Sequence, residues 1–406
     1  MPDEERVPAA PTDAGGANGG SSSSSPGGAL HGRPPRRKLS AATVVAIVVA
    51  VVVVGSGLGY ATYSSYTSKS ANTLASDPCA AYTPAQLGAD AQIGNVSGVV
   101  SPDYAQATTV PNGPIKPVPN GTVIKVVAAE NFWGSLVSQL GGSAVSVLSV
   151  VSDPNTDPHE YEANTTVAAE LASANYVILN GDGYDDWATT ILASQNQPGQ
   201  EVLNVAVLNG VTVSGGIVTG NPHQWYNPLY VNRTLLAMYG DLVALQPQST
   251  ATFQQNWAYM NTTDGPSDGV SLDQLYSRAN QIRADFAGTV VVATESIFVY
   301  LANYTGLDLI APPAFMEAIA EGNDPPSQST ALFECQITSG YVKVLIYNIQ
   351  TVTPITSYIE GLAETHNVTL TYVSETIQPP DTTFELWMYG EYNSLENALN
   401  AYELGQ

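Results

Sequence analysis

The chain has 406 residues, of which 44% are hydrophobic and only 12% are charged. This is enough apolar material to bury the cores of about two domains. The formal net charge is −24, and five of the 12 basic residues precede residue 60, so the rest of the chain would repel the phosphates of a nucleic acid. The composition therefore excludes nucleic-acid binding and predicts a globular protein with an N-terminal appendage.

The first 60 residues carry the signals of a membrane anchor. Residues 1–38 are rich in Gly, Ser and Pro, which predicts a disordered cytoplasmic tail because such segments bury little apolar surface. Residues 39–60 carry no charge, and as a helix they would span roughly 33 Å, enough to cross a bilayer core of about 30 Å. Basic residues lie immediately before this run, so we expect everything after Tyr60 to lie outside the cell membrane. A cleaved signal peptide is the alternative, and the long leading tail argues against it.

Residues 61–120 show no sustained periodicity and end in a segment rich in Pro and Gly. This pattern predicts an extracytoplasmic stalk that lifts the following domain off the membrane. The two cysteines, Cys79 and Cys335, are compatible with one disulfide in an oxidising compartment, but their spacing does not require one. Asn-X-Ser/Thr sequons recur along the chain, and whether they are glycosylated stays open.

Alternating strand and helix patterns predict the fold of the remaining chain. The strands are expected at residues 122–130, 145–151 and 176–181, and again at 289–296, 341–348 and 368–375. Apolar runs between helices are typical of parallel sheets covered on both faces. Residues 226–287 keep helical spacing without a strand signal. We predict an α/β fold with two lobes, each a parallel sheet flanked by helices, at residues 121–225 and 288–406, joined by a long linking helix within 226–287.

Open parallel sheets bind ligands at the carboxyl ends of their strands. We therefore expect four metal-binding side chains at the carboxyl ends of the predicted strands. Two of the chain's four histidines lie in the segments DPHEYE and NPHQWY. Imidazole nitrogens and carboxylate oxygens together suit Zn²⁺, Mn²⁺ or Fe²⁺. Simple helix capping is the alternative, and it explains four such residues less well than a shared metal does. The candidate ligands are His159 and His223 from the first lobe and Glu295 and Glu375 from the second.

From about Val123 to its C-terminus, the chain resembles the metal-binding proteins of zinc and manganese ABC importers, in the cluster that uses a rigid linking helix. The stretches that carry the resemblance, in the family's order, are VVAAENFWGSLVSQLGG, SDPNTDPHEYE, ANYVILNGDGYDDW, NPHQWYNP, ATESIFVYLANYTGL, VKVLIYNIQT and VSETIQPPDTTFELWM. The resemblance implies that the four candidates are the metal ligands in chain order, ending with Glu375. Many relatives have Asp as the fourth ligand, so Asp381 is the alternative at that position.

The residues around the candidate ligands refine this prediction. Glu160 and Glu162 flank the first histidine and are candidate acceptors for its second ring nitrogen, although solvated acids are an equal alternative. The resemblance favours a carboxylate as the third ligand in manganese-type members, whereas Zn²⁺ accepts the same donors. The acidic run GDGYDDW also matches a family loop, and its spacing does not fit a calcium-binding loop.

The function that the resemblance implies is that of an extracytoplasmic solute-binding protein. It would be a monomer and not an enzyme, and it would capture Zn²⁺ or Mn²⁺ and deliver the ion to an ABC permease and its ATPase. A metal-dependent hydrolase is a weaker hypothesis because the chain lacks HExxH. A membrane-anchored adhesin or metal-sequestering module with the same fold is the remaining alternative, and four intact ligand positions argue against lost metal binding.

Overall fold

The computed structural model describes residues 79, 82–88, 115–156, 158–195, 197–211, 220–262 and 269–404. These residues belong to one compact unit, Ser76–Gln406. The predicted tail at residues 1–38 and the predicted membrane helix at residues 39–60 lie outside the described residues. Within the described ranges, no helix combines the length and the apolar character needed to cross a membrane.

The first lobe contains a four-stranded parallel sheet in the order β2-β1-β3-β4. Its strands are β1 (Ile124–Glu130), β2 (Val145–Val151), β3 (Tyr176–Leu179) and β4 (Glu201–Asn204). Its helices are α3 (Asn131–Gly141), α4 (Thr165–Ser173), α5 (Asp186–Gln195) and α6 (Val205–Asn209). The alternation of strand side chains divides the core, because Val126 packs in the larger cluster with α3 while Val127 packs in a smaller cluster with α4 and α5.

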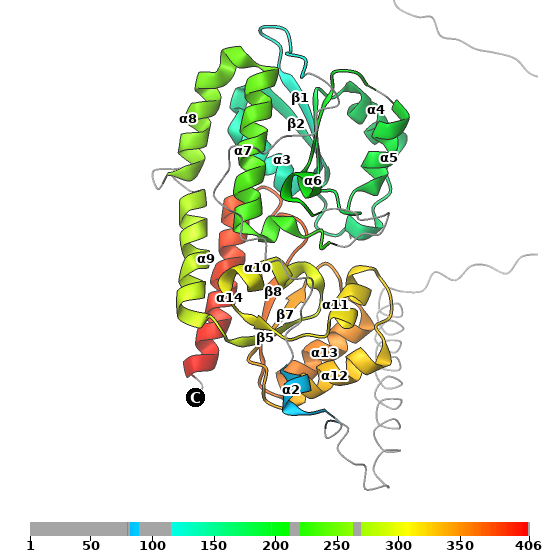
Figure 1. The fold of residues 1–406 in the computed structure, drawn as a ribbon, viewed down its shortest axis with the longest axis vertical. Helices are drawn as coiled ribbons and strands as arrows, with labels where there is room; N and C mark the ends of the chain where they lie inside the picture. The colour runs from blue at the N-terminus through cyan, green and yellow to red at the C-terminus, as the bar shows by residue number, and fades with distance from the viewer. Residues whose placement is uncertain are drawn as a thin grey trace, which may run out of the picture. The chain divides into compact units, whose positions relative to one another are not determined.

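The second lobe repeats this architecture with a parallel sheet in the order β6-β5-β7-β8. Its strands are β5 (Val290–Ala293), β6 (Asp308–Leu309), β7 (Val344–Asn348) and β8 (Thr369–Val373). Its helices are α10 (Val299–Thr305), α11 (Pro313–Ala320), α12 (Ser327–Thr338), α13 (Pro354–Thr365) and α14 (Phe384–Leu404). The prediction of two lobes with parallel sheets flanked by helices is confirmed, and Figure 1 shows the lobes one above the other.

The long linking helix predicted within residues 226–287 is not confirmed as one continuous element. Three helices occupy this region: α7 (Pro228–Leu245), α8 (Thr250–Asn261) and α9 (Leu272–Phe286). Helix α7 ends where Gln246 leaves the helical region with a φ of −143°, and Pro247 follows without an N–H to continue the hydrogen-bond ladder. Figure 1 shows α7 and α8 beside the first lobe and α9 beside the second.

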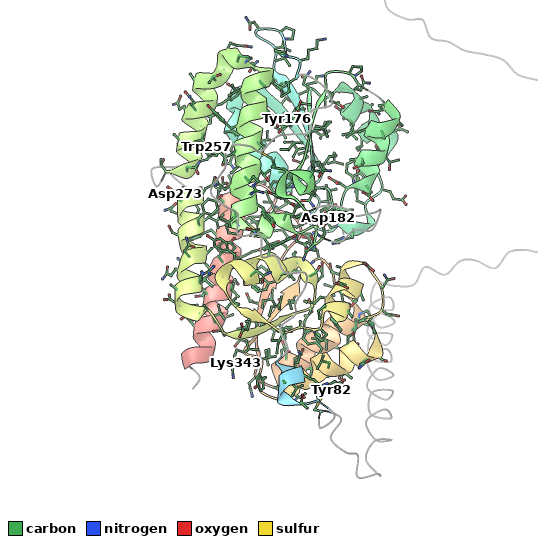
Figure 2. The ribbon with its side chains drawn as sticks, in the orientation of Figure 1. Tyr82, Tyr176, Asp182, Trp257, Asp273 and Lys343 are labelled. Carbon is green, nitrogen blue, oxygen red and sulfur yellow. A yellow bond between two sulfur atoms is a disulfide. The ribbon has the colours of Figure 1, made fainter. Side chains whose placement is uncertain are left out.

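A segment before the first lobe is attached to the second lobe. Cys79 and Cys335 form a disulfide with a Cα–Cα distance of 5.3 Å, which answers the question that their sequence spacing leaves open. Helix α2 (Pro84–Leu87) lies against α12, and Tyr82, labelled in Figure 2, donates a hydrogen bond to the backbone oxygen of Gln328 at 3.5 Å. This part of the predicted stalk is therefore covalently tied to the second lobe.

Candidate metal centre

The four candidate side chains converge between the two sheets. One nitrogen or oxygen atom from each of His159, His223, Glu295 and Glu375 lies within 4.8 Å of all the others. His223 Nε2 is 3.5 Å from Glu295 Oε1 and 3.3 Å from Glu375 Oε1. His159 Nε2 is 3.8 Å and 3.7 Å from the same two oxygens. The two lobes thus contribute two nitrogens and two carboxylate oxygens to one small volume.

The strand topology explains this convergence. In each sheet the second strand in chain order lies on one side of the first strand, and the third strand lies on its other side. Ligands bind at the carboxyl ends of the strands at such topological switch points. His159 lies in a 3-10 turn after β2, and His223 lies just before the turn that leads into α7. Glu295 follows β5 and Glu375 follows β8. Every candidate therefore comes from a connection at the carboxyl edge of a sheet.

Asn221 orients the buried imidazole of His223. The Asn221 Oδ1 atom accepts a hydrogen bond from the His223 backbone N–H at 3.0 Å and lies 2.6 Å from His223 Nδ1. Because the amide oxygen can only accept, Nδ1 carries a proton, and Nε2, on the side of the carboxylates, is the ring nitrogen left for a metal. The amide of Asn221 donates to the Ser296 backbone oxygen at 2.7 Å, which ties this orientation to the second lobe.

Two further polar side chains hold the carboxylates. Asn348, the last residue of β7, donates through Nδ2 to Glu295 Oε2 at 2.7 Å and to Glu375 Oε1 at 2.8 Å. The Tyr184 hydroxyl donates to Glu375 Oε2 at 2.8 Å. Asn348 holds the two carboxylates apart within the second lobe. Tyr184 reaches Glu375 from the first lobe. Glu295 Oε1 has no hydrogen-bond partner among the described residues and faces the two imidazoles.

The pKa values of the two carboxyl groups are shifted in opposite directions. Burial and the adjacent negative charge of Glu375 raise the pKa of Glu295 to about 8. Burial also opposes the ionisation of Glu375, but His223 and His159 outweigh it and hold the pKa of Glu375 well below its ordinary value. At neutral pH the pair therefore retains a proton on Glu295, which a bound cation would displace.

An aromatic shell separates this cluster from solvent. The Trp225 ring packs edge-on against His223 at a centroid distance of 5.3 Å and stacks on Phe132 at 4.1 Å. Tyr184 meets the His159 ring at 4.9 Å. The side chain of His159 is 18% exposed, whereas the other three candidates are fully buried. Solvent therefore approaches the cluster from the side of His159.

The remaining predicted residues are not part of this cluster. Asp381 is exposed in the turn before α14 and does not belong to the group of converging ligand atoms. Glu162 is exposed on the loop after His159, and the side chain of Glu160 lies outside the described atoms. The sequence analysis missed Asn348 and Asn221. One signal was present for Asn348, because it ends a predicted strand at the same sheet edge as the ligands.

Comparisons with known proteins support this architecture. Residues 126–398 match the family described as "Zinc-uptake complex component A periplasmic". The solved structure of the nickel-bound solute-binding protein FpvC from Pseudomonas aeruginosa has a TM-score of 0.53 and 20% identity, covering 69% of this chain and 98% of FpvC. The periplasmic zinc-binding protein TroA from Treponema pallidum has a TM-score of 0.55 and 15% identity, covering 68% and 99%.

A curated relative from Treponema pallidum (strain Nichols), described as "Putative metal-binding protein", is 21% identical over 194 residues. This match covers 44% of the chain and 58% of the relative, which is less than two-thirds of its length. At these identities the solved structures show a shared fold alone. The family match, in contrast, spans well over half of the chain. The chain therefore belongs to the ZnuA family of periplasmic, metal-binding solute-binding proteins.

Proposed function

We propose that this protein captures a divalent transition metal ion through His159, His223, Glu295 and Glu375 and delivers it to an ABC permease. The observation that carries the proposal is the spacing of the donor atoms. A tetrahedral ion with ligand bonds of about 2.1 Å needs ligand atoms roughly 3.4 Å apart. The four distances between imidazole nitrogens and carboxylate oxygens are 3.3 to 3.8 Å, so an ion fits with small adjustments.

The donor set favours Zn²⁺ or Mn²⁺ as the cargo. Two imidazole nitrogens with two carboxylates satisfy both ions, and Zn²⁺ binds such sites more tightly. Related solved structures are named for complexes with Ni²⁺, Mn²⁺ and Cd²⁺ and for a zinc-binding protein. We therefore propose a site whose cargo depends on the supply of metal as well as on affinity. Fe²⁺ accepts the same nitrogen and oxygen ligands and should be included in the same binding measurements.

The burial of the ligand cluster suits the capture of a metal ion better than it suits catalysis. A metal hydrolase needs an open coordination position for water and a nearby general base. Here three candidate ligands are fully buried beneath aromatic rings, and both lobes supply ligands. We expect metal binding to hold the two lobes together, and release to require their separation at the permease.

Metal binding is tested by thermal unfolding. Saturation at about 1,000 times Kd adds roughly 4 kcal/mol to the stability of the folded state, so Zn²⁺ or Mn²⁺ should raise Tm by several degrees. The double variant His223→Ala, Glu375→Gln should show no rise. As a matched control, His366→Ala alters an exposed histidine at the end of α13 and should keep the full rise. A wild-type Tm that responds to none of these ions would reject the proposed site.

Delivery is tested separately in cells. A strain without the protein should accumulate less radioactive zinc or manganese at limiting metal, and the wild-type gene should restore uptake. The His223→Ala variant should not restore it. If the purified protein binds metal but its loss leaves uptake unchanged, the sequestering or adhesive module is the better account.

A further inference from the structure

A cavity lies beside the candidate metal centre. It has a volume of about 230 Å³ and is lined by residues of both lobes. Those that matter here are His159, Asp182, Asn221, Glu317 and Glu321. No lysine or arginine is among the described residues that line it. The cavity therefore adjoins the one partly exposed candidate ligand and carries excess negative charge.

Asp182 provides the feature that ordinary surface acids lack. It is only 8% exposed, yet neither of its carboxylate oxygens has a hydrogen-bond partner among the described residues. A buried carboxylate without partners is costly, which indicates that something else satisfies it. Burial raises its pKa to about 6, so the group is still mostly ionised at neutral pH. Figure 2 labels Asp182 at the edge of the first lobe that faces the second.

The backbone holds Asp182 in this position. Its φ is +57°, in the left-handed region that side chains other than Gly, Asn and Asp seldom adopt. A Cβ atom at Gly220 would lie 2.3 Å from Asp182 Oδ2, so the carboxylate lies close against the backbone of Gly220. The loop after β3 thus directs an ionised carboxylate into the cavity.

The opposite wall is acidic as well. Glu317 and Glu321 are exposed one turn apart at the end of α11, which lies on the side of the second lobe that faces the first (Figure 1). Like charges at this spacing repel each other, and the C-terminal turn of a helix disfavours anions. Glu321 accepts a hydrogen bond from Asn323 Nδ2 at 3.3 Å, which offsets little of this cost. A cation in the cavity would relieve both repulsions.

The size of the cavity suits a hydrated ion. Six waters at about 30 Å³ each occupy roughly 180 Å³, and the cavity holds about 230 Å³. Carboxylates that contact an ion through its waters need no exact bond geometry. A metal ion could therefore rest here with most of its hydration shell and lose waters stepwise to His159, which lines the cavity and also belongs to the ligand cluster.

We propose that this cavity is a second cation site, in which Asp182, Glu317 and Glu321 receive a hydrated divalent transition metal ion before His159 passes it to the buried centre. The inference rests on the proposed metal capture and adds the route to it. An ion on this route passes the same carboxylates on entry and on exit. Removing one of them should therefore slow both steps and leave the equilibrium nearly unchanged.

The test is stopped-flow kinetics on the full chain with Mn²⁺ alone, followed through the intrinsic tryptophan fluorescence. Trp225, which packs against His223, contributes to this signal, and a chelator chase gives the dissociation rate. Asp182→Asn keeps the shape and tolerates the left-handed backbone. We expect it to lower both the association and the dissociation rate constants about tenfold at low ionic strength, with Kd changed less than threefold. The control Glu170→Gln removes the same charge from an exposed residue of α4 outside the cavity and should change either rate less than twofold.

A second variant tests whether the slower rates of Asp182→Asn come from a local change in the first lobe. Glu317→Gln combined with Glu321→Gln alters the other lobe and should slow both rates similarly. The proposal is overturned if Asp182→Asn leaves association unchanged, if only dissociation accelerates, or if the Glu170→Gln control slows association equally. A wild-type protein that gives no fluorescence change and no rise in Tm with Mn²⁺ or Zn²⁺ would instead reject the metal centre itself.

Discussion

Metal capture should release a proton from Glu295. Burial and Glu375 raise the pKa of Glu295 to about 8 in the metal-free protein, so most of this group is protonated at pH 7. A bound metal requires the carboxylate. Binding should therefore release most of one proton from Glu295 at pH 7 and much less at pH 9. Since protons compete with the metal, affinity should strengthen up to about tenfold per pH unit below pH 8 through this group and then level off.

Calorimetry measures this release directly. The apparent binding enthalpy is recorded in several buffers of different ionisation enthalpy at pH 7, and the slope of the plot is the number of protons released. Glu295→Gln cannot release this proton and serves as the matched control at a higher metal concentration. We expect its slope to be lower than that of the wild type by most of one proton. Equal slopes for the two proteins, or an affinity that is flat from pH 6 to pH 8, would refute the reasoning.

Two further predictions concern residues outside the ligand set. Asn348→Ala removes the donor shared by both carboxylates and should weaken metal binding about 10- to 100-fold in a calorimetric titration. The control Asn303→Ala, at an exposed position of α10, should leave the affinity unchanged. Equal affinities for the two variants would show that Asn348 is dispensable. Reduction of the Cys79–Cys335 disulfide should lower the free energy of unfolding by about 2–5 kcal/mol in a denaturant titration. The metal affinity should stay nearly constant because α12 lies away from the metal centre (Figure 1). An unchanged unfolding midpoint would contradict this.

The convergence of the ligands was predictable because it depends on topology. Parallel strands between helices can be recognised from their apolar runs, and their carboxyl ends must share an edge. Glu295 and Glu375 therefore fall together once the strands before them are recognised. The short edge strands β4 and β6, with four and two residues, were missed, because such runs carry too little periodicity to identify.

The hydrogen bonds that organise the cluster were not predictable in the same way. The contacts of Tyr184 with Glu375 and of the Asn221 amide with Ser296 form only after both lobes have packed. Asn348 meets the two carboxylates within the second lobe, and its place at a strand end does not by itself reveal these hydrogen bonds. Nothing in the local sequence of Asn221 or Tyr184 distinguishes them from other polar loop residues. The break after α7 was missed for a different reason, because apolar residues at helical spacing continue past Pro247 and hide the end of the helix. Local pattern located the candidate ligands, whereas tertiary contacts decided their partners.

A crystal structure of the metal-loaded protein, with anomalous scattering recorded at the metal's absorption edge, tests the central claim most directly. We predict that the strongest anomalous peak lies about 2.0–2.3 Å from Nε2 of His159, Nε2 of His223 and one oxygen each of Glu295 and Glu375. A strongest peak coordinated by other residues, such as Asp381, or bound by one lobe alone, would contradict the account.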